Sequence, residues 1–525
     1  MPTLGLTIKP IASIIYFTIV FKVGMQDSYQ STPLPSEMST NAKSNNNDAA
    51  RNRHGVSTIV GSAFVINYLL GTGFLCLPYG FKEAGLVLSS ITLAVVLLVT
   101  DITKNYVLTA MAMAEAMFGI RNKTPTTITY GSVETKDEEA AQSFNAQAFA
   151  NLEKYQIMET KFEYAELVRI FLGKVAESFY IVSVSLTQYL CLWGYTQVFA
   201  SAMAVQFPIS DDLTSDYTLY TFAFASLAVS LSCLNLNEQI LLQLFLTACR
   251  FFLIGCMIFT TLQATFDVDK TYFTTQQGPS GAELFRFQGF FCVFPIIVYS
   301  SLFHNGIPVL SEPLNDKGNA GSMFRWTIMA CFIIFWLLGF FIAYLFGEDV
   351  EQSANLHWND YVGGTGHLGR YGWEGSALWS QAISIFVVVF PALNCISSFP
   401  LNAIVLGNNM MATIYGDNVR EYELNIRFRV TYRLLSTVPP IVGALFVREL
   451  GLITAYAGLF SIATAFVFPP LLYIQSKAMA REAGLRKRTC YKNIGSSNLA
   501  ATTICLLSSI SILYVFVSLV YCGNE

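Results

Sequence analysis

The stretch Asn67-Tyr68-Leu69-Leu70-Gly71-Thr72-Gly73-Phe74-Leu75-Cys76-Leu77-Pro78 lies in the middle of an apolar segment, 56–81, that is long enough to cross a bilayer. The two glycines each lower helix stability by roughly 1 kcal/mol, and the proline has no N–H to donate. Unwound backbone at this depth persists only where protein or a water-filled cavity satisfies its polar groups. The stretch therefore predicts either a broken helix that binds a ligand or a small-residue packing face, and it does not by itself separate the two.

A second interruption, Tyr299-Ser300-Ser301-Leu302-Phe303-His304-Asn305-Gly306-Ile307-Pro308, lies at the centre of the apolar segment 287–310. Paired breaks at corresponding positions of two five-helix halves are typical of inverted-repeat transporters, whose substrates bind between the broken helices. Because five is odd, the second half would run opposite to the first. The second break therefore favours the ligand-binding interpretation of the first.

Composition excludes most water-soluble classes of protein. Of the 525 residues, 53% are hydrophobic and 14% aromatic, while only 13% are charged. The net charge of −4 gives no basic surface for nucleic acid, and the cysteines show no disulfide or zinc spacing. We predict an all-α polytopic membrane protein in a lipid bilayer, with no nucleic-acid partner and no metal.

Eleven apolar segments have the length of a membrane-spanning helix. They are 56–81, 85–114, 178–205, 217–234, 240–264, 287–310, 323–346, 376–405, 430–446, 452–474 and 500–521. Most of the 31 Lys and Arg residues fall on one side of the membrane if the segments alternate, which predicts a cytoplasmic N-terminus.

The segments group into two halves, 56–264 and 287–474, followed by a further helix at 500–521. Residues 1–55 form a polar tail that we expect to be largely disordered. Its apolar stretch 11–23 indicates a targeting sequence, a partial anchor or a misassigned start. The cytoplasmic loop 118–175 ends in an amphipathic stretch, 162–172, that predicts a short helix, and the sequon at Asn122 should stay unglycosylated on this side.

The pattern Asn67-x-x-x-Gly71-x-Gly73-x-x-x-x-Pro78 resembles the first helix of the amino acid/auxin permease family, within the amino acid-polyamine-organocation superfamily. The resemblance is strongest to a poorly characterised eukaryotic transmembrane-protein branch related to neutral amino acid transporters. Further matches are the segments 81–85, 246–250, 298–308, 311–313, 398–400 and 454–458.

This resemblance implies a five-plus-five inverted repeat and secondary active transport of amino acids. The substrate positions that it implies are Asn67, Leu70, Gly71, Thr72, Gly73, Tyr299, Ser300 and Ser301. A coupling sodium ion would use Asn67 with Ser397 and Ser398 of the eighth segment, near Asn394 and Cys395. Tyr189, in the third segment, faces either the cavity or the core.

Ionisable residues inside the apolar segments need partners because a lone charge there costs at least ~2.5 kcal/mol. For Arg250 we favour an ion pair or a carbonyl contact over contact with substrate. Asp101 and Lys104 are three residues apart and should form a self-contained pair, a proton relay through Asp101 being the alternative. His304 is either a hydrogen-bonded packing residue or a group that carries coupling protons.

We predict a carrier, not an enzyme, that moves small amino acids by alternating access. It needs no cofactor, and the only ion implied is a transported Na⁺ or H⁺. Two alternatives remain: a non-transporting amino acid sensor or scaffold, and a membrane-embedded acyltransferase suggested by His304. The carrier would lie in the plasma membrane or an endomembrane such as the vacuole or lysosome, and its protein partners are unknown.

Overall fold

The structure is a computed structural model of the whole chain. It describes residues 57–121, 154–158, 162–233, 240–267, 269–273, 283–364, 378–415, 425–485 and 488–522. The polar tail 1–55 with its apolar stretch, most of the loop after residue 121, and the sequon at Asn122 lie outside these residues.

Each of the eleven predicted segments contains helix, and the described ranges contain no β-strand. In chain order the helices are α3 (Thr58–Leu69), η1 (Gly73–Cys76), α4 (Leu77–Ala84), α5 (Leu86–Arg121), α7 (Tyr164–Leu172), α8 (Lys174–Gln206), α9 (Leu213–Cys233), α10 (Ile240–Phe266), η3 (Phe287–Gly289), α11 (Phe290–Ser300), η4 (His304–Gly306), α12 (Ile307–Ser311), α13 (Ala320–Phe346), η5 (Gly347–Asp349), η6 (Ala354–Asp360), α14 (Leu378–Tyr415), α16 (Ile426–Phe446), α17 (Leu450–Ile462), the π-helical turn η8 (Ala463–Val467), α18 (Phe468–Glu482) and α19 (Asn498–Cys522). Helix α7 confirms the short helix predicted before the third segment.

Length and hydropathy qualify eight of the described helices as membrane spans, or nine when the bent pair at 58–84 counts as one span. The two predicted segments that fall short are α9 and α16, both of which are 21-residue helices. Helix α9 is rich in Ser and Thr, and α16 carries three arginines and two prolines. The eleven segments are thus confirmed as helices, while hydropathy alone marks nine of them as membrane spans.

The first segment is broken where its glycines lie. Helix α3 ends at Leu69, and after a 55° bend the chain resumes helix at Gly73. Pro78 stands within the first two positions of α4, where its missing N–H does no harm. The sixth segment is interrupted as well, because α11 ends at Ser300 and helix resumes only at His304.

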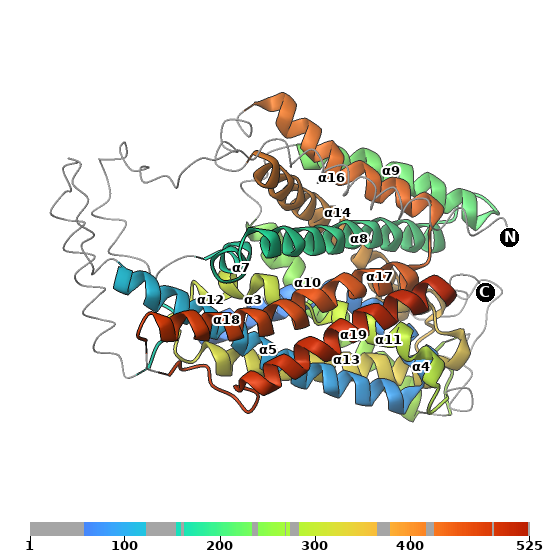
Figure 1. Ribbon diagram of the computed structural model, residues 1–525. Helices are drawn as coiled ribbons and strands as arrows, with labels where there is room; N and C mark the ends of the chain where they lie inside the picture. Colours follow the sequence, from blue (N-terminus) through green and yellow to red (C-terminus); the bar gives the residue numbers. More distant parts are fainter. Residues whose placement is uncertain are drawn as a thin grey trace.

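Two groups of helices form the body of the protein. Helices α8, α9, α14 and α16 pack on one another in one group, and α4, α5, α11 and α13 do so in the other (Figure 1). Helix α17 packs against both α11 and α8 and therefore joins the groups. The two broken segments belong to the second group.

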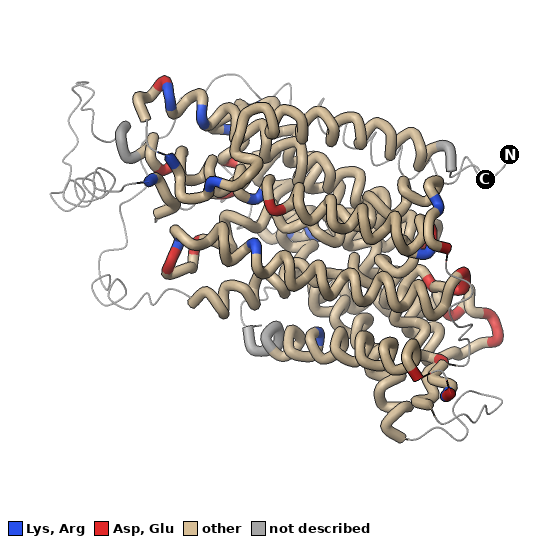
Figure 2. The backbone as a smooth tube through the Cα atoms, turned by 90° about the horizontal axis from the view of Figure 1, so that it is seen from below, with Lys and Arg blue, Asp and Glu red and all other residues tan. Residues whose placement is uncertain are grey.

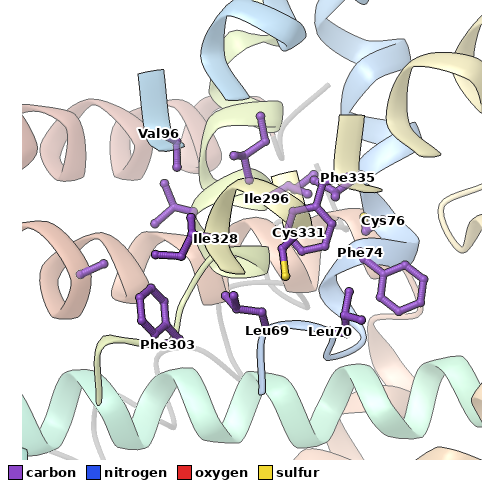
Figure 3. Packing of buried hydrophobic residues seen from close by; sticks show 14 of the residues in the cluster. Leu69, Leu70, Phe74, Cys76, Val96, Ile296, Phe303, Ile328, Cys331 and Phe335 are labelled. Carbon is purple, nitrogen blue, oxygen red and sulfur yellow. The ribbon is translucent and has the colours of Figure 1, made fainter. Parts of the chain in front are cut away.

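Apolar side chains hold the two breaks in the core. In the view of Figure 3, Leu69 lies between Phe303 of the second break and Leu70, with Cys331 and Phe335 of α13 close by. Leu70 and Phe303 are each 0% exposed. Because lipid tails are as apolar as these side chains, close packing rather than removal from water holds the irregular backbone in place.

Charge is distributed unevenly along the bundle. Most described Lys and Arg residues lie at one end, and the opposite end carries most of the Asp and Glu residues (Figure 2). The middle of the bundle is nearly free of charge, apart from a few side chains that are described below. This distribution is typical of a multi-pass membrane protein whose basic loops stay on one side.

Candidate functional site

The two helix breaks meet at Gly73. A Cβ atom placed on Gly73 would lie 2.8 Å from the Ser300 Oγ atom and 3.0 Å from Cδ1 of Tyr299. The Tyr299 side chain also lies beside that of Thr72. Only glycine lets the two backbones approach this closely, so the contact between the two breaks depends on the residue type at position 73.

Beside this contact the structure leaves open space. A Cβ atom placed on Gly71 would have no neighbour within 4 Å among the described residues. Tyr68, in the last turn of α3, keeps 43% of its surface exposed although its ring contacts Gly306 of the sixth segment. A side chain at Gly71 would thus have room, and Tyr68 beside it contacts the other broken segment.

Several main-chain groups at the first break have no hydrogen-bond partner in the part of the chain that the structure describes. The Leu70 and Gly71 N–H groups donate to Ile66 and Leu69, and the Leu75 N–H donates to Thr72. Across the described ranges, the N–H groups of 72–74 meet no acceptor and the carbonyls of 70 and 71 meet no donor. Because orphaned backbone groups are rare in protein interiors, these five groups are candidates for ligand contacts.

The hydroxyl groups of the second break are bonded within their own helix. Ser300 donates to the Ile296 carbonyl at 2.9 Å, and Ser301 donates to the Ile297 carbonyl at 2.7 Å. Both side chains are at least 95% buried. A hydroxyl that donates in this way keeps two acceptor lone pairs, so each serine is left able to accept a hydrogen bond.

Arg250 of α10 joins the first break to α14. Its Nη1 atom donates to the main-chain oxygen of Asn67 at 3.0 Å and to Asn67 Oδ1 at 2.6 Å. Its Nη2 atom donates to Oδ1 of Asn394 at 2.9 Å. For Arg250 we expected an ion pair or a contact with a carbonyl group. The structure shows the carbonyl contact, and none of the described carboxylates lies within ion-pair distance of Arg250.

The α14 residue that contacts Arg250 is Asn394, next to the two serines that the resemblance assigns to a sodium site. Ser398 lies one turn further along the helix, where its main-chain oxygen accepts a hydrogen bond from Asn402. The sequence shows Asn394 as a polar residue in an apolar helix, four residues before Ser398. It does not show that Arg250 is the partner of Asn394, because the two residues are 144 positions apart.

Asp101 and Lys104 form the expected ion pair, with 2.8 Å between Lys104 Nζ and Asp101 Oδ1. The pair is not self-contained, however, since Arg325 of α13 contacts the same carboxylate at 3.2 Å. Lys104 also donates to Oδ1 of Asn105 at 3.1 Å. The prediction of an isolated pair was therefore wrong, because it considered only one helix.

His304 is fully buried beside this cluster. Its Nε2 atom lies 2.8 Å from the hydroxyl of Thr103, and its Nδ1 atom has no partner in the described part of the chain. Packing against Phe303 and Phe466 encloses the ring. This enclosure agrees with a packing role and disfavours the acyltransferase alternative, which requires a histidine that substrate can reach.

Tyr189 does not reach the breaks through its hydroxyl. That group donates to the Leu435 carbonyl at 2.7 Å and lies 3.7 Å from the sulfur of Met410. It therefore connects α8 with α16 and α14, inside the group of helices that lacks the breaks. The structure thus brings Thr72 and Gly73 against Tyr299 and Ser300, and it places Asn67 against Arg250 and Tyr189 in the other group of helices.

Comparison with known proteins agrees with this architecture. A family model described as "Transmembrane amino acid transporter protein" matches residues 54–515. A "Transmembrane protein 104 homolog" of Drosophila melanogaster is 23% identical over 514 residues, which cover 89% of this chain and 95% of the relative. A homolog of the same name in Dictyostelium discoideum is 21% identical over 459 residues, covering 80% and 88%.

"Transmembrane protein 104" of Mus musculus is 23% identical over 462 residues, covering 79% of this chain and 86% of the relative. The match to the family model extends from the first broken segment into the last helix, α19. With the broken first segment, the helical body and a family match over nearly its whole length, the chain belongs to the transmembrane amino acid transporter family.

Proposed function

We propose that the protein is a secondary transporter that moves small amino acids by alternating access. The observation that carries this proposal is the first break, where the N–H groups of 72–74 begin a new half-helix without acceptors in the described structure. Membership of the family supports the same function.

An amino acid substrate has complementary chemistry to this break. Its α-carboxylate would accept from the N–H groups of 72–74, where the positive end of a half-helix favours an anion. Its ammonium group would donate to the orphaned carbonyls of Leu70 and Gly71. The open space at Gly71 is where we place the substrate, with Tyr299, Ser300 and Ser301 opposite.

Alternating access would be a movement of one helix group against the other. Helices α8, α9, α14 and α16 would form a scaffold, and the group with the two broken segments would move. We infer that the halves 56–264 and 287–474 are inverted repeats, because their first helices are both broken and belong to the same moving group. The charge distribution supports a cytoplasmic N-terminus.

Flux measurements on proteoliposomes test this proposal. We expect the purified protein to accumulate at least one labelled small amino acid, at several pH values, above the level of empty liposomes. A sensor would instead bind the amino acid without accumulation, which thermal stabilisation in detergent would detect. Stabilisation by an amino acid with no flux under any condition would contradict the transport proposal and favour the sensor.

A further inference from the structure

Arg250 lies well inside an apolar helix, 10 residues after the first residue of α10 (Ile240–Phe266). A charge at this depth costs roughly 2.5–3.5 kcal/mol unless the protein supplies compensating groups. The described structure compensates it with three neutral oxygens and with no carboxylate: the Asn67 carbonyl, Asn67 Oδ1 and Asn394 Oδ1.

The Asn67 carbonyl is available because the helix breaks just after it. In a continuous helix this oxygen would accept from the Gly71 N–H, but that N–H donates to Leu69 instead. The oxygen also lies at the C-terminal end of α3, which carries partial negative charge. The break therefore creates a cation site, and the guanidinium group occupies it.

These oxygens are the kind of ligand that a coupling sodium ion would need: a carbonyl at an unwound helix end, the Asn67 amide and an oxygen of the eighth segment. A second monovalent cation on the same oxygens would lie about 4 Å from the guanidinium. At an effective dielectric constant near 20, the repulsion would be about 4 kcal/mol. Na⁺ and Arg250 thus exclude each other at this junction.

We propose that Arg250 is a tethered cation that takes the place of a coupling Na⁺ ion where α3, α10 and α14 meet. The inference rests on the proposed function and makes the transport independent of Na⁺. Arginine stays protonated at every physiological pH, so this cation is permanent. It connects the broken helix of the moving group to a helix of the scaffold without needing an ion from solution.

The first test measures the melting temperature of the purified protein in NaCl and in choline chloride, each at about 0.15 M. We expect the wild-type protein to melt at the same temperature in both salts. Arg250→Ala should melt several degrees lower in choline chloride, and NaCl should restore at least half of the loss. Arg250→Lys, which keeps a tethered cation, should remain insensitive to the choice of salt.

Arg448→Ala is the matched control. Arg448 donates to the Thr218 hydroxyl at 3.3 Å and lies over the Tyr217 ring, so its removal leaves neither the three-oxygen site nor a carboxylate pair that would bind Na⁺. This variant should melt at the same temperature in both salts. If Arg250→Ala also melts at the same temperature in both salts, Arg250 is an ordinary structural arginine and the proposal is wrong.

Uptake by wild-type proteoliposomes is the second test and needs no variant. We expect the same rate in Na⁺ and in choline, and a rate that depends on Na⁺ would overturn the proposal even if Arg250→Ala does not fold. Sodium-restored melting of Arg250→Ala together with no uptake of any amino acid would support the cation site and contradict the transport function. The experiments therefore distinguish a failure of the cation-site proposal from a failure of the transport proposal.

Discussion

Gly71 and Gly73 are separated by one residue, yet their surroundings are opposite. A side chain at 73 would meet Ser300 and Tyr299 at 2.8–3.0 Å, whereas a side chain at 71 would enter open space. The first glycine is thus required by the substrate site in our proposal, and the second is required by the packing of the two breaks.

This contrast predicts how the two alanine variants differ in stability. Gly73→Ala should lower the melting temperature by several degrees, because overpacking typically costs 1–3 kcal/mol. Gly71→Ala should melt within about one degree of wild type, since its methyl group meets none of the described residues. Equal melting temperatures for the two variants, measured in detergent without substrate, would contradict the arrangement of the two breaks.

Asp101 of α5 is the carboxylate that pairs with both Lys104 and Arg325. Asp101→Asn should lower stability by about 3 kcal/mol, because it leaves the fully buried Lys104 ammonium group without its anion. Arg325→Gln is the control and should cost less, since 44% of that side chain is exposed. Denaturation of both variants and of Asp101→Asn/Lys104→Met tests this, the double variant being expected to recover part of the loss.

At the level of elements, α11 and α17 pack with their backbones in contact. A Cβ atom on Gly458 of α17 would lie 2.0 Å from the main-chain oxygen of Pro295 in α11. This close packing holds the second broken segment against the helix that joins the two groups.

Gly458→Ala should therefore be among the most damaging small substitutions in the chain. Because a main-chain atom cannot move aside as a side chain can, we expect a loss of at least roughly 3 kcal/mol or no folded protein. Gly255→Ala in α10, where a Cβ atom has no neighbour within 4 Å, should be neutral or stabilising by up to about 1 kcal/mol. Size-exclusion profiles and melting curves of both variants would decide, and a well-folded Gly458→Ala protein would refute this packing.

The sequence predicted the helices better than it predicted the contacts between side chains. Apolar length located all eleven helical segments, and Gly71, Gly73 and Pro78 located the first break, because both signals are local. The partners of Arg250 could not be predicted, since Asn67 and Asn394 come from helices far apart in the sequence. The contact between Arg325 and Asp101 was not predicted for the same reason, because the two residues are 224 positions apart.

For the whole molecule, the charge distribution in Figure 2 makes the orientation testable. Ile494, in the basic loop before α19, is fully exposed, and Asp211 lies in the exposed loop between α8 and α9 at the other end. We expect a membrane-impermeant maleimide to label Asp211→Cys but not Ile494→Cys in intact cells that carry the protein in the plasma membrane. Labelling of Ile494→Cys alone would reverse the proposed orientation, and wild-type protein measures the background from native cysteines.

The whole account depends on a substrate site at the accessible space beside Gly71. The most direct measurement is uptake of a labelled small amino acid by proteoliposomes that contain wild-type or Gly71→Val protein in equal folded amounts. We expect the valine side chain to occupy the substrate position and to reduce uptake at least roughly tenfold, equivalent to ~1.4 kcal/mol, while the melting temperature without substrate stays near that of wild type. Unchanged uptake by Gly71→Val would contradict a substrate site at this break.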